Sequence, residues 1–166
     1  MNARRLSTVG LVLLASLLAL PRTGSAQEPP FRFQYAAKVV CVTNIPGTSA
    51  ATGSVVPGGY LTVVNIHNPN LGTVRIRMKV AETLLPFVSE FVPTSLDADF
   101  ATKVDCSNIA QDFGFTPFHG VEGFLVVESS RSLDVTAVYS AADLEEGDVR
   151  SLAVERVAQR RIAPRP

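Results

Sequence analysis

The residues of this chain best suited to acid–base or metal chemistry are its two histidines, His67 and His119. A small periplasmic metal-dependent or hydrolytic enzyme would combine them with carboxylates such as Asp105 or Glu122, because imidazole and carboxylate groups bind zinc and carry protons. Neither histidine has a second ligand at the i+2 or i+4 position, and the motifs HExxH, GxSxG and CxxC are absent. We therefore expect no catalytic residue, no metal and no cofactor, and keep this enzyme as the alternative.

The acidic segment ADLEEGD, residues 142–148, would offer oxygen ligands to a hard cation such as calcium. Its carboxylates lack the spacing of a calcium-binding loop, and acidic residues beside glycine are common in exposed connections. We interpret this segment as a solvated hairpin turn.

The segment NIHNPN, residues 65–70, ends an apolar run with three asparagines, a histidine and a proline. Asparagine side chains hydrogen-bond within their own turn, so the favoured interpretation is a tight turn that fixes strand register. The same amides would also suit recognition of a glycan or of a partner's backbone. Asn65, His67 and Asn68 are therefore kept as candidate binding residues.

Five of the nine phenylalanines lie in the connections LLPFVSEFVP and QDFGFTPFHG rather than in the strongest strand patterns. Such side chains often plug the open ends of a β-sandwich, and we favour that role. In the alternative, Phe113, Phe115 and Phe118 line a shallow recognition surface beside the asparagine-rich turn.

The two cysteines, Cys41 and Cys106, form an even set in a chain that we expect to be exported. This predicts one disulfide, with two buried free thiols as the alternative. Because the chain between the two cysteines is long, an unstrained bridge would stabilise the fold by roughly 4 kcal/mol.

The first 26 residues have the pattern of a signal peptide, with Arg4 and Arg5 before an apolar core at 11–20 and small residues up to Ala26. The apolar core is too short to span a bilayer. We expect cleavage after Ala26, export by the general secretory route to the periplasm or beyond the cell, and no transmembrane segment in the mature chain. The mature chain would begin at Gln27.

Without residues 1–26 the chain has 12 basic and 15 acidic residues, a net charge of −3. Four of the basic residues lie in the last eleven positions, so residues 27–155 carry −7. This charge argues against a nucleic-acid partner, which needs clustered positive charge. The basic end could bind an anionic cell surface or lipid head groups, although a solvated tail is favoured.

Alternation with a period of two predicts β-strands along most of the chain. VRIRMKV and LDVTAVYSA alternate clearly, while YAAKVVCVT, YLTVVNIH and VEGFLVVES are more apolar and more central; ATKVDC and VRSLAVERV are further strands. SNIAQDF, residues 107–113, predicts a short helix with Ser107 as its N-cap.

The predicted fold is all-β: an antiparallel two-sheet β-sandwich of immunoglobulin-like type, with seven to eight strands and one short helical turn. The expected organisation is a signal peptide at 1–26, a disordered segment at 27–33, the sandwich domain at 34–158 and a basic disordered tail at 159–166. Nine residues are expected to point mostly inward: Leu61, Val63, Val74, Ile76, Met78, Val126, Leu133, Val135 and Tyr139.

The strings KVVC, PGGYLTVVNIHNPN, VDC, GFLVVESSRSLDVTAVYSA and LAVERV resemble a family of small exported bacterial proteins of unassigned function. This resemblance covers most of the mature chain and implies one compact β domain. The order of the NIHNP strand, an alternating strand and a late VVxSxxxLxVxAxY pair is also distantly similar to the β-sandwich of the sensory-rhodopsin transducer family. Neither resemblance implies an activity or a functional residue.

We therefore expect an exported, non-catalytic binding or structural module of the bacterial cell envelope. Its partner is an envelope protein or a glycan, because a sandwich presents loops at its ends and this chain has aromatic residues there. Its ligand and oligomeric state stay open.

Overall fold

The computed structural model describes residues 30–42, 58–83, 85–115, 120–143 and 148–163, and it is an all-β two-sheet sandwich with one short helix. The signal-peptide prediction, His119 and Phe118 lie outside the described residues. The elements in chain order are β1 (Phe33–Cys41), β2 (Gly59–His67), β3 (Val74–Glu82), β4 (Val92–Leu96), β5 (Ala101–Asp105), α2 (Cys106–Asp112), β6 (Val121–Ser129), β7 (Asp134–Ala142), β8 (Val149–Arg156) and β9 (Gln159–Arg161).

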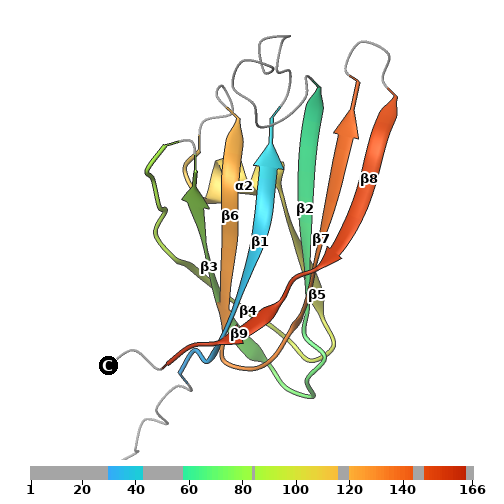
Figure 1. Cartoon of the computed structure of the whole chain (residues 1–166). Helices are drawn as coiled ribbons and strands as arrows, with labels where there is room; N and C mark the ends of the chain where they lie inside the picture. The colour runs from blue at the N-terminus through green and yellow to red at the C-terminus, as the bar shows by residue number, and fades with distance from the viewer. Residues whose placement is uncertain (1–29, 43–57, 84, 116–119, 144–147, 164–166) are drawn as a thin grey trace, which may run out of the picture.

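The strands form two antiparallel sheets (Figure 1). The first sheet has the order β4-β3-β6-β1-β9, and the second has the order β5-β2-β7-β8. The chain crosses from β8 in the second sheet to β9 in the first at the lower end of the view in Figure 1. Helix α2 lies at the upper half of the same view.

The inner faces of the two sheets enclose one apolar core, as the alternating patterns predicted. Val74, Ile76 and Met78 are buried there, opposite an outer row of arginine and lysine side chains on β3. The prediction is also confirmed for Leu133, Val135 and the partly buried Tyr139.

Strand β2 has the opposite phase to the one predicted. Leu61 is 50% exposed and Val63 is partly exposed, whereas Thr62, Val64 and Ile66 point inward. Both phases of YLTVVNIH contain apolar residues, so alternation alone did not determine the phase. The Thr62 side chain is held on the inner face of β2 by the facing sheet. Its hydroxyl accepts a hydrogen bond from Val40 N at 3.0 Å and donates one to Val40 O at 3.2 Å.

Val126 is buried, but on the outer side of the first sheet, since its neighbours Leu125 and Val127 point to the core. Successive side chains of a strand point to opposite faces of the sheet, so the adjacent apolar residues of β6 cover both faces.

Strand β4 is not among the predicted strands, because its first residues, Val92 and Pro93, fall in the segment LLPFVSEFVP that was interpreted as a connection. Proline is tolerated in an edge strand, and β4 is the edge of the first sheet. Two expected boundaries also change: Phe33, placed in a disordered segment, begins β1, and Gln159–Arg161, placed in a disordered tail, form β9 against β1.

Helix α2 begins one residue earlier than predicted, and its N-cap is Asp105 rather than Ser107. The Asp105 carboxylate accepts from Ser107 N at 3.0 Å and from Asn108 N at 3.1 Å. The Asn108 side chain accepts in return from Asp105 N, which completes a capping box.

Candidate functional site

The predicted disulfide is present. Cys41 at the end of β1 and Cys106 at the start of α2 are bonded, with Cα atoms 5.5 Å apart, so the bridge joins the first sheet to the helix that directly follows β5 of the second sheet. Close to it, Val42 N donates to Tyr60 O and Tyr60 N to Val42 O, which brings β1 and β2 together at this end. The disulfide end of the sandwich is therefore fixed by one covalent and two backbone links.

Asn68 organises the turn that follows β2. Its side chain is fully buried, and its Nδ2 lies within 3.0 Å of the carbonyl oxygens of Gly72, Leu96 and Asp97. Its Oδ1 accepts from the backbone and the side-chain amide of Asn70. Because every polar atom of the Asn68 side chain has a protein partner, Asn68 acts within the turn.

His67 instead faces outward at the end of β2, between two aspartates. Its Nε2 lies 3.1 Å from Asp99 Oδ1 and its Nδ1 lies 3.7 Å from Asp134 Oδ2, while Arg156 contacts the other oxygen of Asp134 at 3.3 Å. The side chains of Asp99 and Asp134 are 92% and 50% exposed, so this cluster lies on open surface. Asn65, two residues earlier, is exposed on the same face.

The carboxylates suggested for an enzyme do not meet His67. Asp105 caps α2 and contacts Lys103 Nζ at 2.9 Å, and Glu122 contacts Lys38 Nζ at 2.6 Å in the other sheet. Among the described residues there is no group of three or more His, Cys, Asp or Glu that could hold a metal ion. His67 therefore has a different set of neighbours from the one the sequence suggested.

The hydrogen bond from Lys103 is the largest cause that lowers the pKa of the Asp105 carboxyl, followed by the hydrogen bond with the Asn108 backbone. At Tyr139, burial and then the hydrogen bond to Glu155 raise the pKa to about 12. The hydrogen bonds that contribute to the two shifts lie at a helix cap and between β7 and β8.

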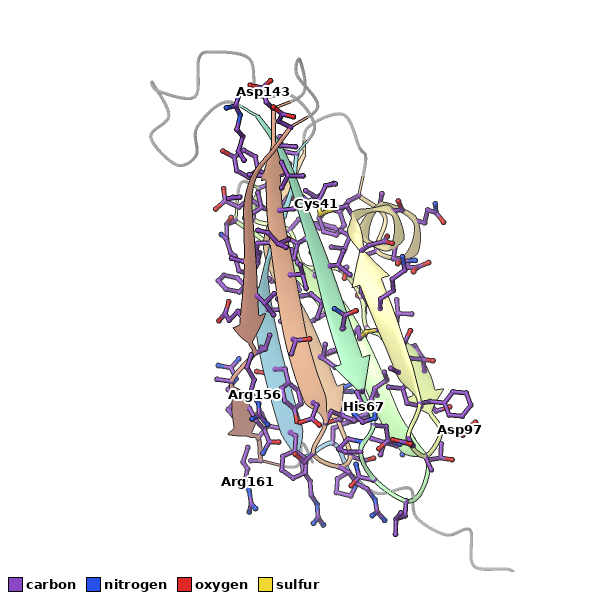
Figure 2. The ribbon with its side chains drawn as sticks, turned by 90° about the vertical axis from the view of Figure 1, so that its right-hand side faces the viewer. Cys41, His67, Asp97, Asp143, Arg156 and Arg161 are labelled. Atoms are coloured by element: carbon purple, nitrogen blue, oxygen red, sulfur yellow. A yellow bond between two sulfur atoms is a disulfide. The ribbon has the colours of Figure 1, made fainter. Side chains whose placement is uncertain are left out.

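The phenylalanines do not join the asparagine-rich turn. Phe113 and Phe115 belong to the buried core, and Phe115 packs edge-on against Phe87 with ring centroids 5.2 Å apart. Phe115 lines a hollow beside the disulfide, whereas His67 lies at the lower end (Figure 2). The favoured role as core plugs holds for these two residues.

Sequence reasoning missed a buried ion pair on the outer face of the first sheet. The Glu128 carboxylate is fully buried, although its place in the β6 alternation points it outward. Arg77 donates to it, and the Arg77 guanidinium lies between the rings of Phe31 and Phe91, 4.3 and 4.2 Å from their centroids. Gln34 also donates to Glu128 at 2.9 Å. No local signal reveals this, because these residues come from four separate segments.

In the part of the chain that the structure describes, no helix is long and apolar enough to cross a membrane.

No family model and no curated protein matches this chain. A solved structure, "Crystal Structure of Thermotoga maritima 1070", is similar with a TM-score of 0.48 and 10% sequence identity. The match covers 79% of this chain and 95% of that one.

Proposed function

We propose that the protein is an exported, non-catalytic module of the bacterial envelope that binds another protein through strand β8 and the adjoining outer face of the second sheet. The observation that carries this proposal is the exposure of β8, in which all eight residues are exposed.

Strand β8 is the edge of its sheet. One side pairs with β7, and the described residues place no strand on the other side. An unpaired edge presents a row of backbone N–H and C=O groups that an extended polypeptide can satisfy, as in recognition by strand addition. This favours a protein partner over a glycan.

The outer face beside this edge is apolar. Register places Val154 beside Val138 and Leu152 beside Ser140, with Val63 and Leu61 on the next strand. Leu61, Leu152 and Val154 are 50%, 68% and 69% exposed. We name this set the β8 face; its residues are Leu61, Val63, Val138, Leu152 and Val154.

An exposed group of apolar side chains is typical of protein contacts. The partner expected here is an extended strand whose alternate side chains are apolar and cover the β8 face. The open surroundings of His67, away from Asp105 and Glu122, support the non-catalytic part of the proposal.

Export is supported by the disulfide, which persists in oxidising compartments, and by the signal-peptide pattern. The N-terminal sequence of the protein recovered from the periplasm or the medium should begin at Gln27. Full-length material starting at Met1 in a membrane fraction would contradict export.

Site-specific photocrosslinking in the producing cell tests the β8 face. A photoreactive residue at position 152 or 154 should yield one discrete adduct with another protein. The matched control is position 100, because Phe100 is similarly exposed at 62% in the connection between β4 and β5. An adduct of twice the chain mass would identify a second copy as the partner. Equal adducts at all three positions, or none at 152 and 154, would refute the proposal.

A further inference from the structure

A hollow of about 590 Å³ lies where β1, β9 and the connection between β6 and β7 meet. Three arginines line it: Arg32 just before β1, Arg131 in the β6–β7 connection and Arg161 in β9. We call it the arginine hollow. It lies at the lower end of the molecule, where Figure 2 labels Arg161, and it is separate from the β8 face.

The backbones that carry these arginines are tied to one another. Arg32 N donates to Ser129 O at 2.9 Å, and Ile162 N donates to Arg32 O at 2.9 Å. The Ser129 hydroxyl donates in turn to Arg131 O at 2.6 Å. The backbone segments that carry the three arginines therefore form one hydrogen-bonded frame, which lowers the entropic cost of collecting them around a ligand.

The charge in the hollow is uncompensated within the described residues. No aspartate or glutamate lines it, and none of its three guanidinium groups lies within 4 Å of a described carboxylate. Elsewhere on the molecule Arg77 and Arg156 each contact an acidic side chain. Three like charges around one concave space repel each other and attract an anion.

The arginine side chains of the hollow favour a phosphate group as the anion. Guanidinium groups match the oxygens of a phosphate group in a two-pronged geometry and keep their charge at every physiological pH. Phe33 and Ile162 add apolar wall, so the hollow also suits the carbon part of a small ester. Its volume falls in the range of small-ligand sites, about 300–1,000 Å³.

We propose that the arginine hollow binds a phosphate group, carried by an anionic phospholipid head group or by a soluble phosphorylated sugar. The inference is independent of the proposed protein partner, because none of the residues of the β8 face lines the hollow.

Binding is measured on the chain as recovered after export, with three probes: inorganic phosphate, glucose 1-phosphate, and phosphatidylcholine vesicles with or without phosphatidylglycerol. The test variants are Arg131→Gln and Arg161→Gln. The control is Arg150→Gln, which removes the same charge beside Asp143 at the opposite end (Figure 2). We expect the test variants to weaken binding about tenfold or more and the control to leave it unchanged.

Loss confined to the test variants supports the site, and the probe that binds identifies the source of the phosphate. Equal weakening by Arg150→Gln would show general charge attraction and overturn the proposal. Absence of binding to every probe would overturn it as well. Circular dichroism of each variant confirms that the fold is retained, and a variant that unfolds is replaced by Arg32→Gln.

Discussion

The Arg77 Nε lies 2.8 Å from Glu128 Oε2 in an ion pair whose carboxylate has no contact with solvent. Arg77 is on β3 and Glu128 on β6, directly opposite each other in the register of the first sheet. A buried ion pair is costly to break, because the remaining charge has lost its hydration and its partner.

Replacing Arg77 with alanine should therefore lower the free energy of unfolding by about 3–5 kcal/mol. The double variant Arg77→Met with Glu128→Leu should recover most of that loss, since it removes both charges and keeps the volume. Urea unfolding of the three proteins measures both effects. If the double variant is as unstable as the single one, the loss comes from packing of the Phe31 and Phe91 rings against Arg77 instead.

The Cys41–Cys106 bridge joins residues 65 apart in the sequence. Replacing both cysteines with alanine should lower the free energy of unfolding by roughly 4 kcal/mol, because the unfolded chain gains the freedom that the bridge removes. Thiol titration of the unfolded wild type should find no free thiol before reduction. A double variant with unchanged stability would show that the two backbone bonds between Val42 and Tyr60 already hold this end together.

Much of this fold follows from alternation in the sequence. On β3 the apolar residues occupy a single phase, so Val74, Ile76 and Met78 could be assigned to the core directly. On β2 both phases contain apolar residues, and the hydrogen bonds between the Thr62 side chain and the Val40 backbone of the other sheet hold the Thr62 phase inward. That contact connects distant parts of the chain, so no window of the sequence contains it.

The arginine hollow could not be predicted from the sequence either, because its residues are far apart along the chain. Arg32, Arg131 and Arg161 meet only because β9 returns to pair with β1 at its first residues. The candidate turn was found from its composition, but composition did not separate the buried Asn68 from the exposed Asn65.

The asparagine-rich turn allows a direct comparison of these two amides. Asn68→Ala should cost about 2–3 kcal/mol in unfolding free energy, because the buried carbonyl oxygen of Leu96 and the part-buried one of Asp97 lose their donor. Asn65→Ala, at an exposed position, should change stability by less than about 0.5 kcal/mol. Thermal or urea unfolding measures both. Equal destabilisation by the two substitutions would contradict a structural role specific to Asn68.

His67→Ala complements that pair of variants. The imidazole lies between exposed aspartates, so its loss should alter stability by about 1 kcal/mol or less. If the variant stays folded and loses binding to cell-wall glycans or envelope extracts, His67 belongs to a binding site. If wild type and variant give the same binding profile, the cluster with Asp99 and Asp134 is a surface feature alone.

Tyr139 should ionise well above the usual range of a phenol, because burial and the hydrogen bond to Glu155 raise its pKa to about 12. A phenol ordinarily ionises near pH 10, so the folded state favours the protonated form. The corresponding stability is fully present below about pH 10 and is lost as the pH rises from there towards 12. Ultraviolet absorbance of tyrosinate, followed against pH, resolves this late step, and Tyr139→Phe should remove it.

Glu155→Gln should move the late step only part of the way back towards pH 10. The amide oxygen still accepts from the Tyr139 hydroxyl, which lies 2.8 Å from Glu155 Oε2 in the wild type, and burial stays the largest cause of the shift. The carboxylate charge that opposes ionisation is absent in this variant. If Tyr139 ionises near pH 10 in wild-type protein that circular dichroism shows to be folded, then Tyr139 is neither buried nor held against Glu155 of β8 in solution.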